Sequence, residues 1–195
     1  MRLIFATNNQ NKIAEIKSAV TAGLNIITLT EAGIDIDIPE PHNTLEENAR
    51  EKSTVIHKIT GENCFSEDTG LEVTALNGEP GVRSARYAGD EADNKKNIAL
   101  LLQNMEGKIE RAAQFKTVIS LLLDKQEYQF TGMCKGKIFT EERGGGGFGY
   151  DSIFIPDGDE RTFAEMAMEE KNNYSHRKKA VVKLIDFLNR KNGKS

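Results

Sequence analysis

Two stretches of this sequence carry the residue types that phosphate and metal chemistry need. The first, TNNQNK at residues 7–12, is wholly polar and leads into a helical pattern of apolar residues. A loop that runs from a strand into a helix points backbone N–H groups, and the positive end of the helix dipole, at an anion. Lys12 adds a full charge in the first helical turn, where a cation is unfavourable without an anion nearby. The stretch predicts a phosphate-binding loop, and a plain polar loop with an Asn cap is the alternative.

The second stretch, EDTG at residues 67–70, follows a short apolar strand pattern. At the carboxyl end of a strand in an open α/β sheet, such carboxylates face bound ligands. Adjacent strand residues point to opposite sides, so Glu67 and Asp68 are expected to have different roles. One of them would act as a base or a metal ligand. Glu40, between two prolines, would be a second oxygen ligand for Mg²⁺, which binds one or two carboxylates plus substrate phosphates. A turn with solvated charges is the alternative.

A glycine-rich segment, GGGGFGYD at residues 144–151, formally contains GxGxxG, but a strand pattern follows it where a dinucleotide site would need a helix. Glycine lets the backbone approach a ligand closely. Phe148 has a flat face that can stack on a base, and a surface loop with Phe148 in the core is the alternative.

A basic cluster, YSHRKK at residues 174–179, opens the last helical pattern. If Ser175 caps this helix, His176 and Arg177 lie in its first turn, against the helix dipole. The planar guanidinium of Arg177 suits a carbonyl or a phosphate. We therefore interpret Arg177 as functional and the two lysines after it as solvated.

Periodicity predicts the elements that would position these residues. Strands are expected at 2–6, 25–29, 64–66, 112–123, 128–139 and 152–155, with 112–123 and 128–139 forming an antiparallel hairpin. Helices are expected from 13 to a stop at Gly23, from a capping box at Thr44 to 59 with a stop at Gly61, at 93–105, weakly at 163–168, and at 175–189. This order predicts an α/β fold: a twisted mixed sheet flanked by helices, with two lobes and a central substrate cleft, in a single two-lobed domain of residues 1–195.

Composition and charge narrow the class of protein. The chain has 195 residues, of which 38% are hydrophobic, so it can bury a core without disulfide or metal staples. A net charge of -4 excludes a chain held on nucleic acid or on a membrane by its overall charge, while a small anionic ligand needs only a local basic pocket. Cys64 and Cys134 lack zinc-site spacing and indicate reduced thiols in a cytoplasmic protein. No apolar run approaches the ~20 residues that span a bilayer.

Six segments together resemble the non-canonical purine nucleoside triphosphate pyrophosphatases, which remove inosine and xanthosine triphosphates from the nucleotide pool. They are ATNNQNK at 6–12, EENA at 46–49, SEDTGLEV at 66–73, GVRSARYAG at 81–89, GGFGYD at 146–151 and YSHR at 174–177. The resemblance spans most of the chain in the family's order. It implies Mg²⁺-dependent hydrolysis between the α and β phosphorus atoms, giving a monophosphate and pyrophosphate, by a homodimer. The sequence departs from the family's pattern at Asn8, where many members carry Gly, and at Glu67, where Asp is common.

The resemblance also implies a role for each site residue. Asp68 would activate water and would bind Mg²⁺ together with Glu40. Donors on His176 and Arg177 would pair with the O6 acceptor of hypoxanthine or xanthine, and an unpaired donor facing adenine would cost ~1–3 kcal/mol. The triphosphate would contact Thr7, Asn8, Asn9, Gln10, Asn11, Lys12, Lys52 and Thr69, and the base would contact Phe148, Gly149, Tyr150, Asp151, Lys171, His176 and Arg177.

Two other functions stay open at this point. One is a Mg²⁺-dependent phosphohydrolase of broader nucleotide specificity that releases orthophosphate. The other is a non-catalytic module that binds nucleotides or RNA. Product analysis separates the first from a pyrophosphatase, and turnover of any kind excludes the second.

Overall fold

The computed structural model describes residues 1–20, 24–191 and 193, and the predicted α/β class is confirmed. The strands are β1 (Arg2–Phe5), β2 (Asn25–Thr28), β3 (Cys64–Val73), β4 (Pro80–Gly81), β5 (Ala112–Leu123), β6 (Gln126–Ile138) and β7 (Phe154–Pro156). The helices are α1 (Gln10–Ala19), α2 (Leu45–Thr60), α3 (Asn94–Asn104), α4 (Met168–Tyr174) and α5 (His176–Lys191), with 3-10 turns η1 (Thr74–Leu76), η2 (Ser84–Arg86) and η3 (Phe163–Glu165).

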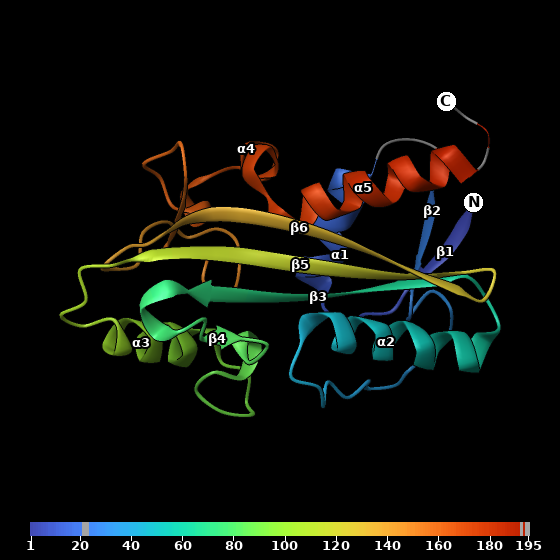
Figure 1. Cartoon of the computed structure of the whole chain (residues 1–195), viewed down its shortest axis with the longest axis horizontal. Coiled ribbons are helices and arrows are strands. Elements are labelled where there is room, and N and C mark those ends of the chain that lie inside the picture. Colours follow the sequence, from blue (N-terminus) through green and yellow to red (C-terminus); the bar gives the residue numbers. More distant parts are fainter. Residues whose placement is uncertain (21–23, 192, 194–195) are drawn as a thin grey trace. The chain divides into compact units, whose positions relative to one another are not determined.

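The sheet is mixed, as predicted. Its strand order is β2-β1-β3-β5-β6-β7, with β4 paired to β3 (Figure 1). β1 is parallel to both β2 and β3, whereas β3 and β4, and β6 and β7, are antiparallel. β5 and β6 are joined by Asp124 and Lys125, both at positive φ, which is the geometry of a tight hairpin turn. The hairpin predicted for the two long strand patterns is therefore confirmed.

The chain divides into two compact units, and the strands β3, β5 and β6 contribute to both. The first unit consists of residues 1–68, 117–132 and 177–195, and the second of residues 69–116 and 133–176. The central cleft expected from the sequence stays a prediction.

In the first unit, helices cover both faces of the parallel strands. Leu3 and Phe5 pack with apolar residues of α1 and α5, whereas Ile4 and Ala6 pack on the other side with Ile56 of α2. Figure 1 shows α5 and α2 on opposite sides of β3. A strand that is buried on both faces needs apolar residues at successive positions. This requirement explains why the first strand pattern in the sequence shows no polar alternation.

The core of the second unit contains a cluster of aromatic rings. Phe115 of β5 contacts Phe154 of β7 edge-on, with ring centroids 4.7 Å apart, and Phe163 of η3 lies 5.1 Å from Phe154. Ile98 and Leu101 of α3 belong to the same buried cluster. The chain next to Phe163 lies against the glycine-rich segment 144–149: a Cβ at Gly144 would lie 2.4 Å from the carbonyl carbon of Ala164.

Helix α2 forms where the capping box predicted it. The Thr44 hydroxyl accepts a hydrogen bond from the Glu47 backbone N–H, and Gly61 ends the helix in the left-handed conformation at φ 69°. The helical period places Lys52 on the same buried stripe as Ala49 and Ile56. A cation therefore lies on the core-facing side of this helix.

Two sequence-based boundaries are wrong. The strand expected at 64–66 continues to Val73, so EDTG at 67–70 lies inside β3 and neither ends a strand nor forms a turn. Both carboxylates are buried in this strand and are paired with cationic side chains, as described below. Helix α1 begins at Gln10, before Ile13, because Asn9 caps it. The last helix begins at His176, so His176 and Arg177 lie in its first turn as expected, and it follows a separate α4 that the sequence did not predict. The stop expected at Gly23 lies outside the described residues.

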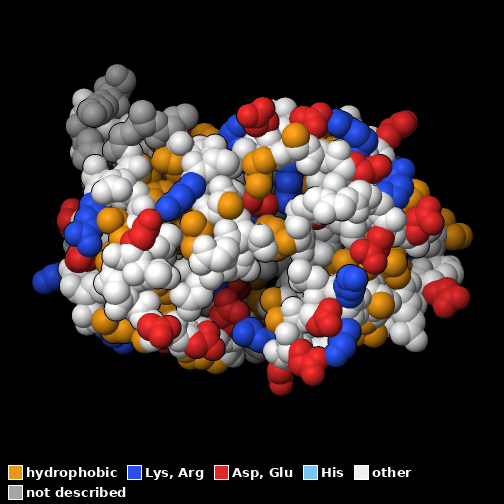
Figure 2. All heavy atoms as spheres, turned by 180° about the vertical axis from the view of Figure 1, so that it is seen from behind, with side chains coloured by type: hydrophobic (Ala, Val, Ile, Leu, Met, Phe, Trp, Pro, Cys, Tyr) orange, Lys and Arg blue, Asp and Glu red, His pale blue; other side chains and the backbone are white. Residues whose placement is uncertain are grey.

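Acidic and basic side chains are interspersed over the described part of the face in Figure 2, with hydrophobic side chains scattered among them. This mixture fits the small net charge of -4. Within the described ranges, no helix is long and apolar enough to cross a membrane.

Candidate active site

The polar segment after β1 forms hydrogen bonds within itself and leads into α1. The Asn9 side chain accepts a hydrogen bond from the Lys12 N–H at 3.1 Å, and the Thr7 hydroxyl accepts one from the Asn9 N–H at 3.2 Å. The predicted Asn cap is therefore present. A short loop of residues 6–9 thus leads from β1 into the N-terminus of the ten-residue helix α1. A helix N-terminus that follows a strand in this way favours a bound anion.

A lysine and two carboxylates meet in the first unit. The Lys52 ammonium from α2 donates to Asp68 of β3 at 3.0 Å, and it also hydrogen-bonds to Glu40, which lies in the loop before α2. Lys52 and Asp68 are 6% and 5% exposed, so water contributes little screening to this pair. Two of the residues predicted from separate motifs, Glu40 and Asp68, thus share one cationic partner.

Burial and neighbouring charges act in opposite directions on these groups. Burial raises the pKa of Asp68, although the ammonium groups of Lys52 and Lys12 act against it. Burial also lowers the pKa of Lys52, but Asp68 and Glu40 outweigh it, and the pKa of Lys52 is raised overall. A carboxylate whose pKa is raised while a cation keeps it ionised is a stronger proton acceptor than a solvated one.

A second buried ion-pair chain runs beside the first. The Lys12 ammonium lies 2.6 Å from Glu67, and the Arg177 guanidinium lies 3.3 Å from the other oxygen of the same carboxylate. Arg177 also hydrogen-bonds to Glu15 of α1. Glu67 and Asp68 therefore have different partners, as the strand alternation predicted. The anion expected near Lys12 is, within the protein itself, the carboxylate of Glu67.

The carboxylates around Asp68 fit a magnesium ion that takes only some of its ligands from the protein. Glu40 and Asp68 approach the same ammonium, so both carboxylates can reach one cation. Over the described residues, no group of three or more His, Cys, Asp or Glu side chains could hold a metal. Two carboxylates without a full cage is the arrangement expected where Mg²⁺ takes its other ligands from water and substrate phosphates.

In the second unit, Asp151 organises the glycine-rich segment. One oxygen of its carboxylate accepts hydrogen bonds from the Phe148 N–H at 2.9 Å and from the Lys171 ammonium at 2.6 Å. Asp151 and Lys171 are both buried. The same ammonium lies 5.4 Å from the centre of the Phe148 ring, close enough for a cation–π contact.

Three further contacts fix the surroundings of this segment. The Tyr150 hydroxyl donates to the backbone carbonyl of Ser84 at 2.9 Å, and the Ser84 hydroxyl accepts from the Leu71 N–H at 2.8 Å. The His176 ring stacks on Phe115 with centroids 4.7 Å apart. The segment is therefore braced by β3 and by the core of its own unit.

The structure groups the predicted site residues within each unit. The first unit contains Thr7, Asn8, Asn9, Gln10, Asn11, Lys12, Glu40, Lys52, Asp68 and Arg177, and the second contains Thr69, Phe148, Gly149, Tyr150, Asp151, Lys171 and His176. Arg177, expected at the purine edge, lies 2% exposed in the ion-pair chain with Glu67 and Glu15.

Sequence reasoning missed two residues of these networks. Glu15 lies three residues after Lys12 and one before Ile16, so it falls on the buried face of α1. A carboxylate at a core position is unusual, and this could have indicated a buried cationic partner. Ser84 lies inside the GVRSARYAG segment, and its bonds to Leu71 and Tyr150 join residues distant in sequence. No local pattern could have shown it.

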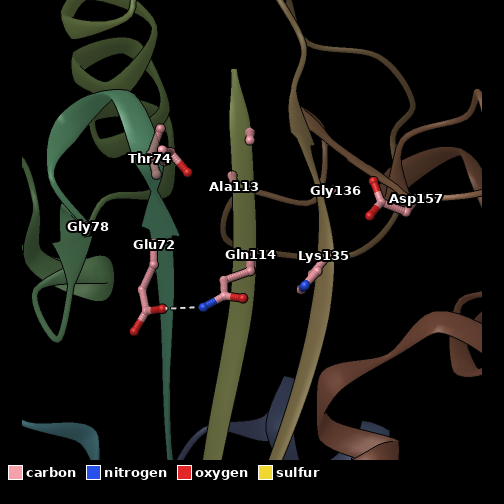
Figure 3. Close-up of a pocket in the computed structure, with 10 residues that line it drawn as sticks. Glu72, Thr74, Gly78, Ala113, Gln114, Lys135, Gly136 and Asp157 are labelled. Atoms are coloured by element: carbon pink, nitrogen blue, oxygen red, sulfur yellow. Dashed lines mark hydrogen bonds between the residues drawn. The ribbon is translucent and has the colours of Figure 1, made fainter. Parts of the chain in front are cut away.

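A hollow of about 480 Å³ on the sheet of the second unit contains none of the predicted site residues. Figure 3 shows Glu72 and Gln114 pointing toward each other from neighbouring strands, joined by a 2.7 Å hydrogen bond, with Lys135 on the next strand and Asp157 beyond it. Its lining mixes charges of both signs with small apolar residues such as Ala113. The candidate active site is therefore not this hollow.

Comparisons with known proteins identify relatives over nearly the whole chain. A model described as the Ham1 family matches residues 3–187. A dITP/XTP pyrophosphatase of Flavobacterium psychrophilum is 49% identical over 96% of this chain and 99% of its own length. One of Porphyromonas gingivalis is 47% identical over 96% and 97%. Among solved structures, a HAM1 protein from Coxiella burnetii has a TM-score of 0.89 at 35% identity, covering 97% of this chain and 99% of that one.

Proposed function

Because the chain belongs to the Ham1 family, we propose that it hydrolyses non-canonical purine nucleoside triphosphates, namely ITP, dITP and XTP, to the monophosphate and pyrophosphate. The observation that carries the proposal is the buried Asp68 carboxylate, which has a raised pKa and shares Lys52 with Glu40. The names of the relatives, dITP/XTP pyrophosphatase, support the substrate class.

The residues of the first unit would bind the phosphates and act in the hydrolysis. The N-terminus of α1 and the ammonium groups of Lys12 and Lys52 attract the triphosphate and stabilise the charge that moves onto pyrophosphate. Asp68 accepts a proton from the attacking water, and burial strengthens it as a base. A bound Mg²⁺, held by Glu40 and Asp68, would add Lewis-acid stabilisation of the phosphate charge.

The residues of the second unit would bind the purine base. Phe148 offers its ring for stacking, and Asp151 holds both the Phe148 backbone and the Lys171 ammonium in place. Donors such as Lys171 and His176 match the O6 acceptor of hypoxanthine and xanthine and face a donor in adenine. The buried position of Arg177 supports an indirect part for it, through Glu67 and Glu15.

We further propose a cytoplasmic homodimer that acts on small molecules, without nucleic acid or a membrane as partner. Both cysteines are free thiols, which suits a reducing compartment. The homodimer follows from the family resemblance.

Product analysis tests the proposed reaction. With Mg²⁺, inosine triphosphate should give pyrophosphate and inosine monophosphate in equal amounts. The kcat/KM for inosine, deoxyinosine and xanthosine triphosphates should exceed that for adenosine triphosphate by roughly tenfold or more, since an unpaired donor costs ~1–3 kcal/mol. Orthophosphate as the sole product would point to the broader phosphohydrolase, and absence of turnover with every purine triphosphate would point to the binding module.

Asp68→Asn tests the proposed base. The variant keeps the shape of the side chain but removes a proton acceptor, so kcat should fall by about 10²–10⁴-fold while nucleotide binding, measured by calorimetry, largely persists. Asp90→Asn, at an exposed position, is the matched control. Turnover by Asp68→Asn at the wild-type rate would remove Asp68 from the mechanism.

A further inference from the structure

We propose that Asn8 is a positioning residue for Glu40: its side chain holds the segment of residues 34–38 in place, so that Glu40 is presented beside Asp68 before any metal arrives. The inference rests on the proposed function, in which Glu40 is a metal ligand. It assigns to Asn8 a task other than the phosphate contact expected from the sequence.

The first observation is the direction of the Asn8 amide. Its Nδ2 donates to the backbone carbonyl of Ile36 at 2.8 Å, across 28 positions of the chain. The neighbours of Asn8 have local partners instead: Asn9 caps α1 and the Thr7 hydroxyl accepts from the Asn9 N–H. Asn8 is thus the member of this polar segment whose side chain is tied to the Glu40 loop.

The second observation is how little regular structure holds the Glu40 loop. Residues 34–40 belong to neither a helix nor a strand. Ile34, Ile36 and Ile38 pack on the cluster around Ile4, and the two aspartates between them are exposed. Packing of these side chains does not fix the backbone, because the segment has no sheet partner. A hydrogen bond to the Ile36 carbonyl therefore removes backbone conformational freedom that packing leaves.

The third observation is that Glu40 lies between two backbone positions, each hydrogen-bonded to an asparagine side chain. On its C-terminal side, the buried Asn48 of α2 accepts from the His42 N–H at 2.9 Å and donates to the His42 carbonyl at 3.2 Å. On its N-terminal side, Asn8 binds Ile36. Prolines at 39 and 41 restrict the backbone between the two ties. Glu40 is therefore held on both sides, and the Asn8 tie is the more exposed of the two.

Preorganisation of this kind acts on affinity. A ligand that is ordered in advance loses less entropy when it binds, so loss of the tie should weaken metal binding without changing the chemistry at Asp68. One neutral hydrogen bond is worth ~0.7–1.4 kcal/mol, which corresponds to roughly three- to tenfold in an equilibrium constant.

Asn8→Ala tests the inference with two measurements, and Asn43→Ala, at an exposed position in the same loop, is the matched control. In the metal-free protein, cleavage by an Asp-specific protease before Asp35 and Asp37, followed by mass spectrometry, should be roughly three- to tenfold faster in Asn8→Ala, because cleavage needs local opening. In the assay, the Mg²⁺ concentration for half-maximal activity should rise by a similar factor, with kcat at saturating Mg²⁺ unchanged. Asn43→Ala should match the wild type in both.

Two results would overturn the inference. One is an unchanged cleavage rate in Asn8→Ala. The other is a raised KM for nucleotide with an unchanged Mg²⁺ requirement, which would mean that Asn8 contacts phosphate directly. If the wild type hydrolyses no nucleotide, the proposed function fails, while the protease measurement still decides whether Asn8 holds the segment.

Discussion

At the scale of single residues, Lys52 neutralises two carboxylates of the candidate site. Its ammonium is the shared partner of Glu40 and Asp68, and it lies on the buried stripe of α2. Removing one member of a buried ion pair leaves the others desolvated and uncompensated, which costs far more than losing a surface salt bridge.

Lys52→Met keeps the length of the side chain and removes its charge, so Glu40 and Asp68 are left to repel each other. The free energy of unfolding in urea should fall by about 3 kcal/mol, and Mg²⁺ should restore part of it because a cation then replaces the ammonium. Lys58→Met, exposed on the same helix, should stay within about 0.5 kcal/mol of the wild type. Equal stability of the two variants would contradict the buried pairing.

At the scale of elements, each site segment depends on a local feature that sequence alone indicates. Helix α2 presents Lys52 because its N-terminus is capped at Thr44 and its C-terminus at Gly61. In the glycine-rich segment, the Phe148 N–H reaches the Asp151 carboxylate where the backbone of Gly147 passes close to it. We therefore expect loss of the helix cap to lower stability, and a side chain at Gly147 to disturb the proposed base site.

Thr44→Ala removes the cap of α2. The Glu47 N–H loses its acceptor, and the free energy of unfolding should fall by about 1 kcal/mol. Thr54→Ala, inside the same helix, is the comparison variant, and chemical denaturation is the measurement. A larger loss for Thr54→Ala would show that the cap is not what stabilises this helix.

Gly147→Ala should disturb the Asp151 network. Gly147 has a φ of +72°, and a Cβ there would lie 2.2 Å from the Asp151 carboxylate oxygen that binds Phe148 and Lys171. The left-handed conformation alone costs a non-glycine residue roughly 1–2 kcal/mol. We expect a raised KM for nucleotide with kcat less affected.

Gly145→Ala provides the matched control, since a Cβ at Gly145 meets no atom within 4 Å. It should leave KM unchanged. Equal KM values for the two variants would show that the glycine segment does not depend on the approach of Gly147 to Asp151.

At the scale of the whole molecule, stability depends on groups that the core keeps out of water. Cys64 lies in the core of the first unit, where burial raises the pKa of its thiol to about 12, and burial also raises the pKa of Tyr150 in the second unit. In both cases the folded protein retains a proton that the unfolded chain releases. Alkaline conditions therefore favour unfolding.

The pH dependence of unfolding checks this for Cys64. Above its ordinary value near pH 9 and below about pH 12, the unfolded thiol is ionised and the folded thiol is not. The free energy of unfolding should therefore fall with rising pH, by at most ~1.4 kcal/mol per pH unit from this group. Between pH 9 and 10, Cys64→Ala should show a shallower slope than the wild type in urea titrations. Identical slopes would mean that the thiol is not buried.

The sequence by itself determined the parts of this protein that depend on neighbours along the chain. The capping box at Thr44 and the alternation before and after Asp124 predicted α2 and the hairpin, because caps and periodicity are local. The motif types also indicated phosphate, metal and base chemistry. Only the tertiary structure decided which carboxylate meets which cation: Asp68 meets Lys52, while Glu67 meets Lys12 and Arg177, which lies 110 positions away. Such pairs follow from how strands and helices pack, and burial strengthens them, so no local pattern specifies them.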